Sequence, residues 1–134
     1  MSGIIFSDLG QASAFMELDW VQELLQQSLG YYPFPATLNV RPTAAADAGI
    51  WQRAQIELAG IPLGPKNGGY CSARLFRIEI HRTGSVGGAP VPGAILLPEV
   101  KDYPKDKIEI IAPMRLKDHL AVKDGDALTL EFLN

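Results

Sequence analysis

The chain has 134 residues, of which 47% are hydrophobic and 20% are charged, and its formal net charge is −3. This size and composition predict a single globular domain, residues 1–134, with a buried core. The acidic pI, near 5.3, argues against a nucleic-acid partner, because such proteins usually carry a basic face. No apolar stretch approaches the roughly 20 residues that a membrane-spanning helix needs.

The cysteine and histidine content excludes two further classes of site. Cys71 is the sole cysteine, so no internal disulfide can form. His81 and His119 lie far apart and have no zinc-ligand spacing with that cysteine. The first residues also lack the basic start and long apolar run of a secretion signal, so we expect a cytoplasmic protein.

The N-terminal part of the chain predicts short strands followed by a helix. Residues 3–7 and 12–16 are expected to form two strands joined by a bend. Between residues 19 and 29 the apolar side chains recur with helical spacing, and Gly30 follows where a C-terminal cap belongs. Two prolines then force an extended approach to a strand at 37–40.

The rest of the chain predicts strands separated by Gly- and Pro-rich loops. Residues 76–80 alternate cleanly between apolar and polar side chains, whereas residues 54–59 alternate weakly. Further strands are expected at 94–97, 108–112 and 127–133. A short helix suits residues 114–120, with Pro113 at its first position. Many short strands with only two helices indicate a mainly β fold, a barrel, because closure hides strand edges.

Thr37, Asn39 and Glu109 are candidate site residues. Thr37 and Asn39 lie two apart on a predicted strand, so both side chains leave one face, and their neutral oxygens suit Mg²⁺ beside phosphate and water. An ordinary strand start has the same pattern. Glu109 should point away from its two isoleucine neighbours, and a carboxylate there could bind a polyhydroxylated ligand or take a proton. The alternative is an outward side chain in solvent.

Arg115 and Lys117 form a second candidate group. They flank Leu116 just after Pro113, at the start of the short predicted helix. The free N–H groups and dipole of a helix start favour anions, so a phosphate could bind there. Solvated helix charges without a ligand are the alternative explanation.

Three blocks of sequence carry a family resemblance. They are Leu-Gly-Tyr-Tyr-Pro-Phe-Pro-Ala-Thr-Leu-Asn-Val at 29–40, Gly-Ala-Ile-Leu-Leu-Pro at 93–98, and Glu-Ile-Ile-Ala-Pro-Met-Arg-Leu-Lys-Asp-His-Leu at 109–120. The chain closely resembles the CTP-dependent riboflavin kinases, small enzymes best known from archaea. The resemblance implies a six-stranded cradle-loop β-barrel with one longer helix near the N-terminus and one short helix near the C-terminus. It also implies transfer of the γ-phosphate of CTP to the riboflavin 5′-hydroxyl, giving FMN and CDP.

The resemblance implies roles for individual residues. Thr37 and Asn39 would hold the Mg²⁺ that bridges nucleotide and flavin. Glu109, the candidate catalytic residue, would contact the polar side of the flavin, either as a base or as an anchor, and Lys101 stands at a flavin-binding position where the family has a threonine. The residues that would bind the nucleotide are Leu9, Gly10, Gln11, Ala12 and Ser13 in a loop, and Arg115, Leu116, Lys117 and Asp118 after the third block.

The nucleotide loop departs from the family pattern. Asp8 and Ala12 stand where the family has glycines, and Ser13 stands where it has a basic residue. Asp8 adds negative charge beside the proposed triphosphate, which would repel it. A non-catalytic binding protein for flavin or another small metabolite, built on the same barrel, is therefore a second hypothesis.

A third hypothesis comes from residues 113–126. This stretch also resembles the Pro-x-x-Leu-Arg-x-x-Leu-x-x-x-x-Gly-Asp signature of AbrB-type swapped-hairpin regulators, which are dimeric DNA binders in related barrels. The acidic pI weighs against DNA binding. The sequence leaves the oligomeric state open.

Overall fold

The computed structural model describes residues 1–7, 11–64, 72–84 and 88–133, with the backbone alone for residues 11–13. The strands are β1 (Ser2–Phe6), β2 (Leu38–Pro42), β3 (Ile61–Leu63), β4 (Ala73–Arg82), β5 (Val91–Pro98), β6 (Ile108–Ile111) and β7 (Ala127–Phe132). The helices are α1 (Gln11–Met16), α2 (Asp19–Leu29), α3 (Ala45–Glu57) and α4 (Leu116–His119). None of these described helices is long and apolar enough to cross a membrane.

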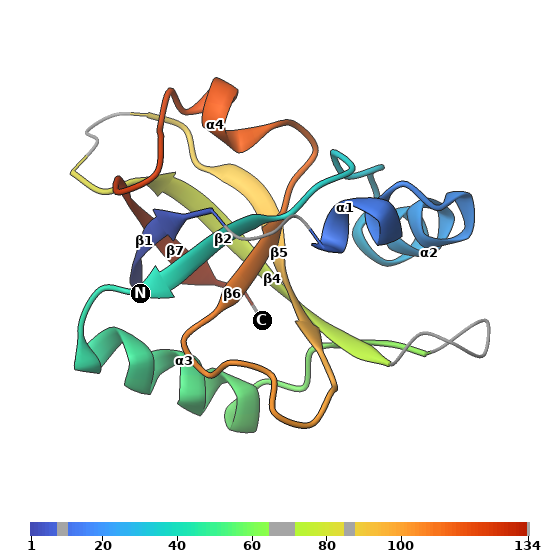
Figure 1. Ribbon diagram of the computed structural model, residues 1–134, viewed down its shortest axis with the longest axis horizontal. Coiled ribbons are helices and arrows are strands. Elements are labelled where there is room, and N and C mark those ends of the chain that lie inside the picture. The colour runs from blue at the N-terminus through green and yellow to red at the C-terminus, as the bar shows by residue number, and fades with distance from the viewer. Residues whose placement is uncertain (8–10, 65–71, 85–87, 134) are drawn as a thin grey trace.

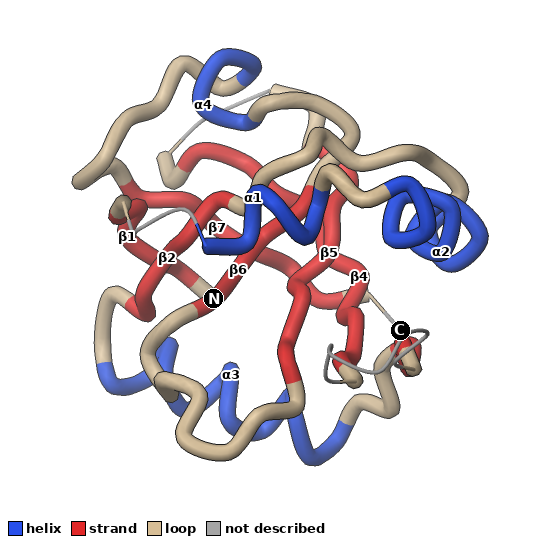
Figure 2. Tube along the Cα trace, turned by 45° about the vertical axis from the view of Figure 1, so that its right-hand side comes forward, coloured by secondary structure: helices blue, strands red, loops and turns tan. Residues whose placement is uncertain are grey.

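Six strands close into an antiparallel barrel, which confirms the predicted fold class. Their order is β4, β5, β6, β2, β1 and β7, and β7 pairs back onto β4 (Figures 1 and 2). β3 is an additional strand outside the ring. It pairs with residues 73–75 of β4, whereas β7 pairs with residues 78–82 along the same edge of β4.

Alternation along the strands separates the interior of the barrel from its outer face. Val40 of β2 and Ile108 and Ile110 of β6 belong to the interior cluster. Ile111, which points the opposite way, belongs to a second cluster beneath α2. Glu109 shares this outward direction, as the sequence predicts.

α2 covers part of the outer face and confirms the predicted helix at 19–29. Leu25 and Leu29 are buried against Leu96 of β5 and Ile111 of β6. Gly30 ends the helix with a φ of 88°, a conformation that glycine adopts at little cost. The apolar stripe therefore decided where this helix packs.

Residues 12–16 form part of α1, so the strand expected there was wrong. Met16 is fully buried in the cluster beneath α2, and Phe15 meets Trp20 edge to face with ring centroids 5.9 Å apart. Five residues are too few to distinguish alternation from a single helical turn. Packing against α2 and the barrel decides between the two conformations.

α3 is a helix that the sequence pattern does not predict, and the weakly alternating residues 54–59 include its end. It lies across one end of the barrel, away from α4 (Figure 1). Trp51 packs edge to face on Phe76, with centroids 5.5 Å apart, and stacks on Phe132 at 6.1 Å. At the first turn, Asp47 accepts a hydrogen bond from the backbone N–H of Ala44 at 3.1 Å.

Candidate functional site

β2 and β6 bring Thr37, Asn39 and Glu109 together. Asn39 pairs directly with Glu109 in the antiparallel ladder. The hydroxyl of Thr37, one residue before β2, donates to Oε1 of Glu109 at 3.4 Å. Residues 72 positions apart are thus neighbours on the outer face of the barrel. The sequence predicted the pair Thr37 and Asn39 separately from Glu109, and the structure places all three in one cluster.

Glu109 is buried, with a relative exposure of 6%, and is the buried charged side chain of the described structure. This result rules out the alternative of an outward residue in solvent. The hydroxyl of Tyr103 donates to Oε2 of Glu109 at 2.5 Å. Both carboxylate oxygens therefore accept hydrogen bonds from neutral hydroxyls. These bonds offset part of the free-energy cost of burying the carboxylate.

Asn39 contributes an unsatisfied acceptor to the cluster. Its side-chain oxygen Oδ1 is buried and has no hydrogen-bond partner among the described residues. Buried polar atoms are nearly always paired, so an unpaired one beside a buried carboxylate marks a place where a ligand could supply the missing partner. A cation or a hydroxyl donor would satisfy it.

A metal ion beside Thr37, Asn39 and Glu109 would need ligands other than a cluster of protein carboxylates. Within the described ranges no three His, Cys, Asp or Glu side chains gather as metal ligands. Mg²⁺, however, commonly takes one or two protein oxygens and completes its shell with phosphate oxygens and water. The hydroxyl of Thr37 is the hydrogen-bond donor to Glu109, and no described residue donates to its oxygen, so that oxygen can still accept a cation. The side-chain oxygens of Thr37 and Asn39 fit such an ion.

The residues predicted to bind nucleotide phosphates are held in ion pairs. Nη1 of Arg115 lies 2.7 Å from Oδ1 of Asp118, and Nζ of Lys117 lies 2.9 Å from Oδ1 of Asp124. The side chain of Leu116 is buried in the interior cluster, so it anchors α4 to the barrel. Any contact of Leu116 with a nucleotide would have to come from its backbone.

The start of the nucleotide loop lies beside these charges. Ser7, which follows β1, donates a short hydrogen bond to Oδ2 of Asp124, the acid that also binds Lys117. This hydrogen bond, and then Lys117, lowers the pKa of Asp124. Among the loop residues, Leu9 and Gly10 lie outside the described residues, as does Asp8. Gln11, Ala12 and Ser13 form the backbone start of α1.

Lys101 is exposed on the segment between β5 and β6. No hydrogen bond or ion pair joins it to Glu109 in the described structure, whereas Tyr103, two residues later, reaches Glu109 directly. Sequence reasoning missed Tyr103. The available signal was an aromatic residue within a charged, turn-rich segment that leads into the strand of Glu109.

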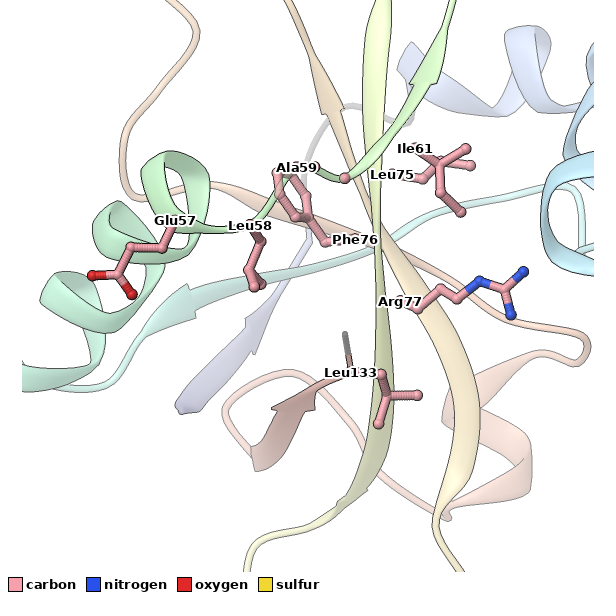
Figure 3. A pocket seen from close by; sticks show the side chains of 9 residues that line it. Glu57, Leu58, Ala59, Ile61, Leu75, Phe76, Arg77 and Leu133 are labelled. Atoms are coloured by element: carbon pink, nitrogen blue, oxygen red, sulfur yellow. The ribbon is translucent and has the colours of Figure 1, made fainter.

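A separate hollow of about 320 Å³ lies beside the end of α3 (Figure 3). It is lined mainly by apolar residues from the α3–β3 connection, from β4 and from the residue after β7, including Leu58, Phe76 and Leu133. None of its lining residues was predicted to bind a ligand. Its lining includes neither Thr37, Asn39 nor Glu109, so the hollow is separate from that cluster.

Comparison with known proteins decides the family. A family model named CTP-dep_RFKase, described as "Domain of unknown function DUF120", matches residues 5–132. The chain belongs to the CTP-dependent riboflavin kinase family. The match includes residues 113–126, the stretch that also resembles AbrB-type regulators.

Named relatives in this family differ in length. The chain is 36% identical over 137 residues to a riboflavin kinase of Aeropyrum pernix, covering 98% of this chain and 94% of that protein. It is 32% identical over 134 residues to a riboflavin kinase of Pyrobaculum islandicum, covering 98% of this chain but 59% of that protein. For a riboflavin kinase of Methanococcoides burtonii the identity is 29%, and 54% of that protein is covered. The chain thus spans little more than half the length of the last two.

Proposed function

We propose that this protein is a riboflavin kinase that transfers the γ-phosphate of CTP to the 5′-hydroxyl of riboflavin, giving FMN and CDP. Family membership and the named relatives support the reaction class. The observation that carries the proposal is the cluster of Thr37, Asn39 and Glu109, because it joins an unsatisfied acceptor, a hydroxyl held only by a long hydrogen bond and a buried carboxylate. Phosphoryl transfer requires mainly such positioning and charge neutralisation.

In this proposal Thr37 and Asn39 hold Mg²⁺. The ion would supply positive charge to the phosphate oxygens of CTP. Thr37 directly precedes β2 and Asn39 lies two residues later within it, a spacing that lets both side chains serve one ion. Their part is to fix the place of the phosphates relative to the flavin.

Glu109 binds the ribityl end of riboflavin. Its carboxylate accepts a hydrogen bond from a ribityl hydroxyl, replacing the long contact with Thr37. The 5′-hydroxyl oxygen attacks the γ-phosphorus, the bond from that phosphorus to the β–γ bridging oxygen breaks, and CDP leaves. The proton of the attacking hydroxyl passes to Glu109, which is why we assign it the catalytic role.

Arg115 and Lys117 meet the phosphates of CTP, and Leu9, Gly10, Gln11, Ala12 and Ser13 bind the nucleotide, the last three from the first turn of α1. Both cations are paired with acids when no ligand is bound, so a phosphate has to displace Asp118 or Asp124. These pairs are solvent-exposed and screened, and therefore weak. A polyphosphate carries several charges and can compete with them.

A second candidate function keeps the barrel and the flavin but not the catalysis. It is supported by the altered loop, where Asp8 and Ala12 replace glycines of the family pattern and Ser13 replaces a basic residue. A flavin-binding protein of this kind would bind riboflavin without forming FMN. Lys101, in place of a threonine, would then alter the choice of ligand.

One experiment separates the two functions. Purified protein is incubated with riboflavin, MgCl₂ and either CTP or ATP, FMN is quantified by chromatography, and riboflavin affinity is measured by titration calorimetry. The kinase proposal predicts FMN with a clear preference for CTP. Riboflavin binding without FMN would favour the binding protein, and binding of neither substrate would contradict both.

A further inference from the structure

The two oxygens of the Glu109 carboxylate are held unequally. The hydroxyl of Tyr103 lies 2.5 Å from Oε2, while the hydroxyl of Thr37 lies 3.4 Å from Oε1. A short bond to an ionised group is strong, whereas 3.4 Å is near the outer limit of a hydrogen bond. Oε2 therefore stays hydrogen-bonded to Tyr103, whereas Oε1 can exchange its weak bond with Thr37 for a bond to another donor.

Because Glu109 is buried, its two hydrogen bonds determine how its carboxylate is oriented. Glu109 is 6% exposed, so water contributes little to its orientation, and neighbouring groups have to fix the side chain. Tyr103 approaches from the segment between β5 and β6, whereas Thr37 approaches from the entry to β2. The ring of Tyr103 also lies under Nζ of Lys107, 5.9 Å from its centroid. The ring has its own contact, and the hydroxyl is the part that acts on Glu109.

We propose that Tyr103 is the positioning residue of the riboflavin site. It fixes Glu109 through Oε2, so that Oε1 can exchange its long contact with Thr37 for a hydrogen bond from a hydroxyl of the substrate. This inference rests on the proposed function. Tyr103 is not among the residues that the sequence predicts for the site. The part of the substrate that Glu109 recognises is a hydroxyl that donates to Oε1. Tyr103 acts through Glu109 and does not itself take part in phosphate transfer.

Tyr103→Phe tests the role because it removes the hydroxyl and keeps the ring. We expect riboflavin affinity to fall about tenfold, since a hydrogen bond to a charged group is lost. The KM for riboflavin should rise with it, while the affinity for CTP in MgCl₂ stays within about twofold, because the nucleotide residues lie on other segments. Riboflavin binding is followed by quenching of flavin fluorescence.

Tyr32→Phe is the matched control. Tyr32 also donates its hydroxyl to a glutamate, Glu23 on α2, at 3.0 Å, but both side chains are exposed and neither contacts Glu109 through a hydrogen bond in the described structure. It should leave riboflavin and CTP affinity unchanged. Glu109→Gln completes a double-mutant cycle: in its background Tyr103→Phe should change riboflavin affinity by less than about threefold, because the charge that Tyr103 orients is gone.

The outcomes separate this inference from the proposed function. Failure of the wild-type protein to bind riboflavin overturns both. Wild-type riboflavin binding with an unaltered Tyr103→Phe variant overturns only the role of Tyr103. An equal loss of riboflavin and CTP affinity together with a lowered melting temperature, or an undiminished effect in the Glu109→Gln background, would show that Tyr103 does not act through Glu109.

Discussion

At the scale of single residues, the site concentrates hydrogen-bond acceptors where a folded protein normally avoids them. Asn39 leaves a buried oxygen unpaired beside the buried carboxylate of Glu109. Such an atom costs free energy in the unliganded protein, typically about 1–3 kcal/mol. A bound ligand that pairs with Oδ1 of Asn39 would remove this cost. Asn39 is therefore expected to lower the stability of the unliganded protein while serving its function.

Asn39→Leu tests this opposition. Leucine removes the unpaired oxygen at similar volume and is tolerated in strands, so the unliganded variant should be no less stable than the wild type, with a gain of up to about 2 kcal/mol. FMN formation should fall at least about 100-fold, because half of the proposed protein ligand pair is lost. Chemical denaturation and the FMN assay measure the two effects. A destabilised variant that keeps its turnover would contradict the assignment.

Asp124→Asn tests the competition between Asp124 and phosphate for Lys117. Asparagine can still accept from Ser7 but no longer neutralises the lysine, so CTP affinity should rise several-fold at low salt and less at high salt. Calorimetric titration with CTP at about 50 mM and about 500 mM NaCl measures both. Glu131→Gln is the control, because Glu131 is an exposed acid paired with His81. Unchanged CTP affinity would contradict the competition.

The same variant has a predictable pH dependence. The hydrogen bond from Ser7, and then Lys117, lowers the pKa of Asp124 in the folded protein below its ordinary value. The stabilisation is therefore present above the unfolded-state pKa, near 3.8, and is lost as the pH falls below it towards the folded-state pKa. Thermal melting at falling pH should show a shallower acid decline for Asp124→Asn than for the wild type. Parallel curves would contradict the lowered pKa.

Sequence reasoning found some of these residues for a physical reason. Thr37, Asn39 and Glu109 lie in or next to strands, where a spacing of two fixes the face and the motif gives the chemistry. Tyr103 lies between strands, and only the folded chain shows that this segment turns back onto Glu109. The ion pair between Lys117 and Asp124 likewise depends on how α4 and the following turn are placed.

At the scale of elements, α2 and α3 show when a helix can be read from sequence. α2 has an apolar stripe and a glycine cap, and its predicted bounds agree with the structure. α3 buries mainly Trp51 and Ala54, so it has no stripe, and alanine-rich composition and an N-terminal acid stabilise it instead. A helix that covers one end of a barrel needs only a narrow contact.

Trp51→Ala tests how α3 is held. The variant loses contacts with Phe76 and Phe132, and we expect a cost of about 3–5 kcal/mol in unfolding free energy. Ile56→Ala, on the same helix but at a position that is 84% exposed, should change stability by less than about 0.5 kcal/mol. Urea denaturation compares the two. Equal effects would show that Trp51 does not hold α3 against the barrel.

At the scale of the whole molecule, the closed barrel explains why the fold was predictable although several elements were not. Short alternating strands with glycine and proline between them leave edges that only closure can pair, and the six-stranded ring provides it. The added strand β3 and the helices α1 and α3 lie outside that ring and do not alter it. The ring brings β2 and β6 side by side, and so the two halves of the site.

The central claim is that this cluster is the site of phosphate transfer, and the magnesium dependence of FMN formation in Thr37→Ala tests it most directly. Thr83→Ala is the control, since it also removes a hydroxyl in a hydrogen bond, that with Thr129. We predict that Thr37→Ala forms FMN at least about tenfold more slowly at low MgCl₂ and recovers in part as MgCl₂ is raised, while Thr83→Ala follows the wild type. Identical magnesium curves for all three proteins would contradict the account.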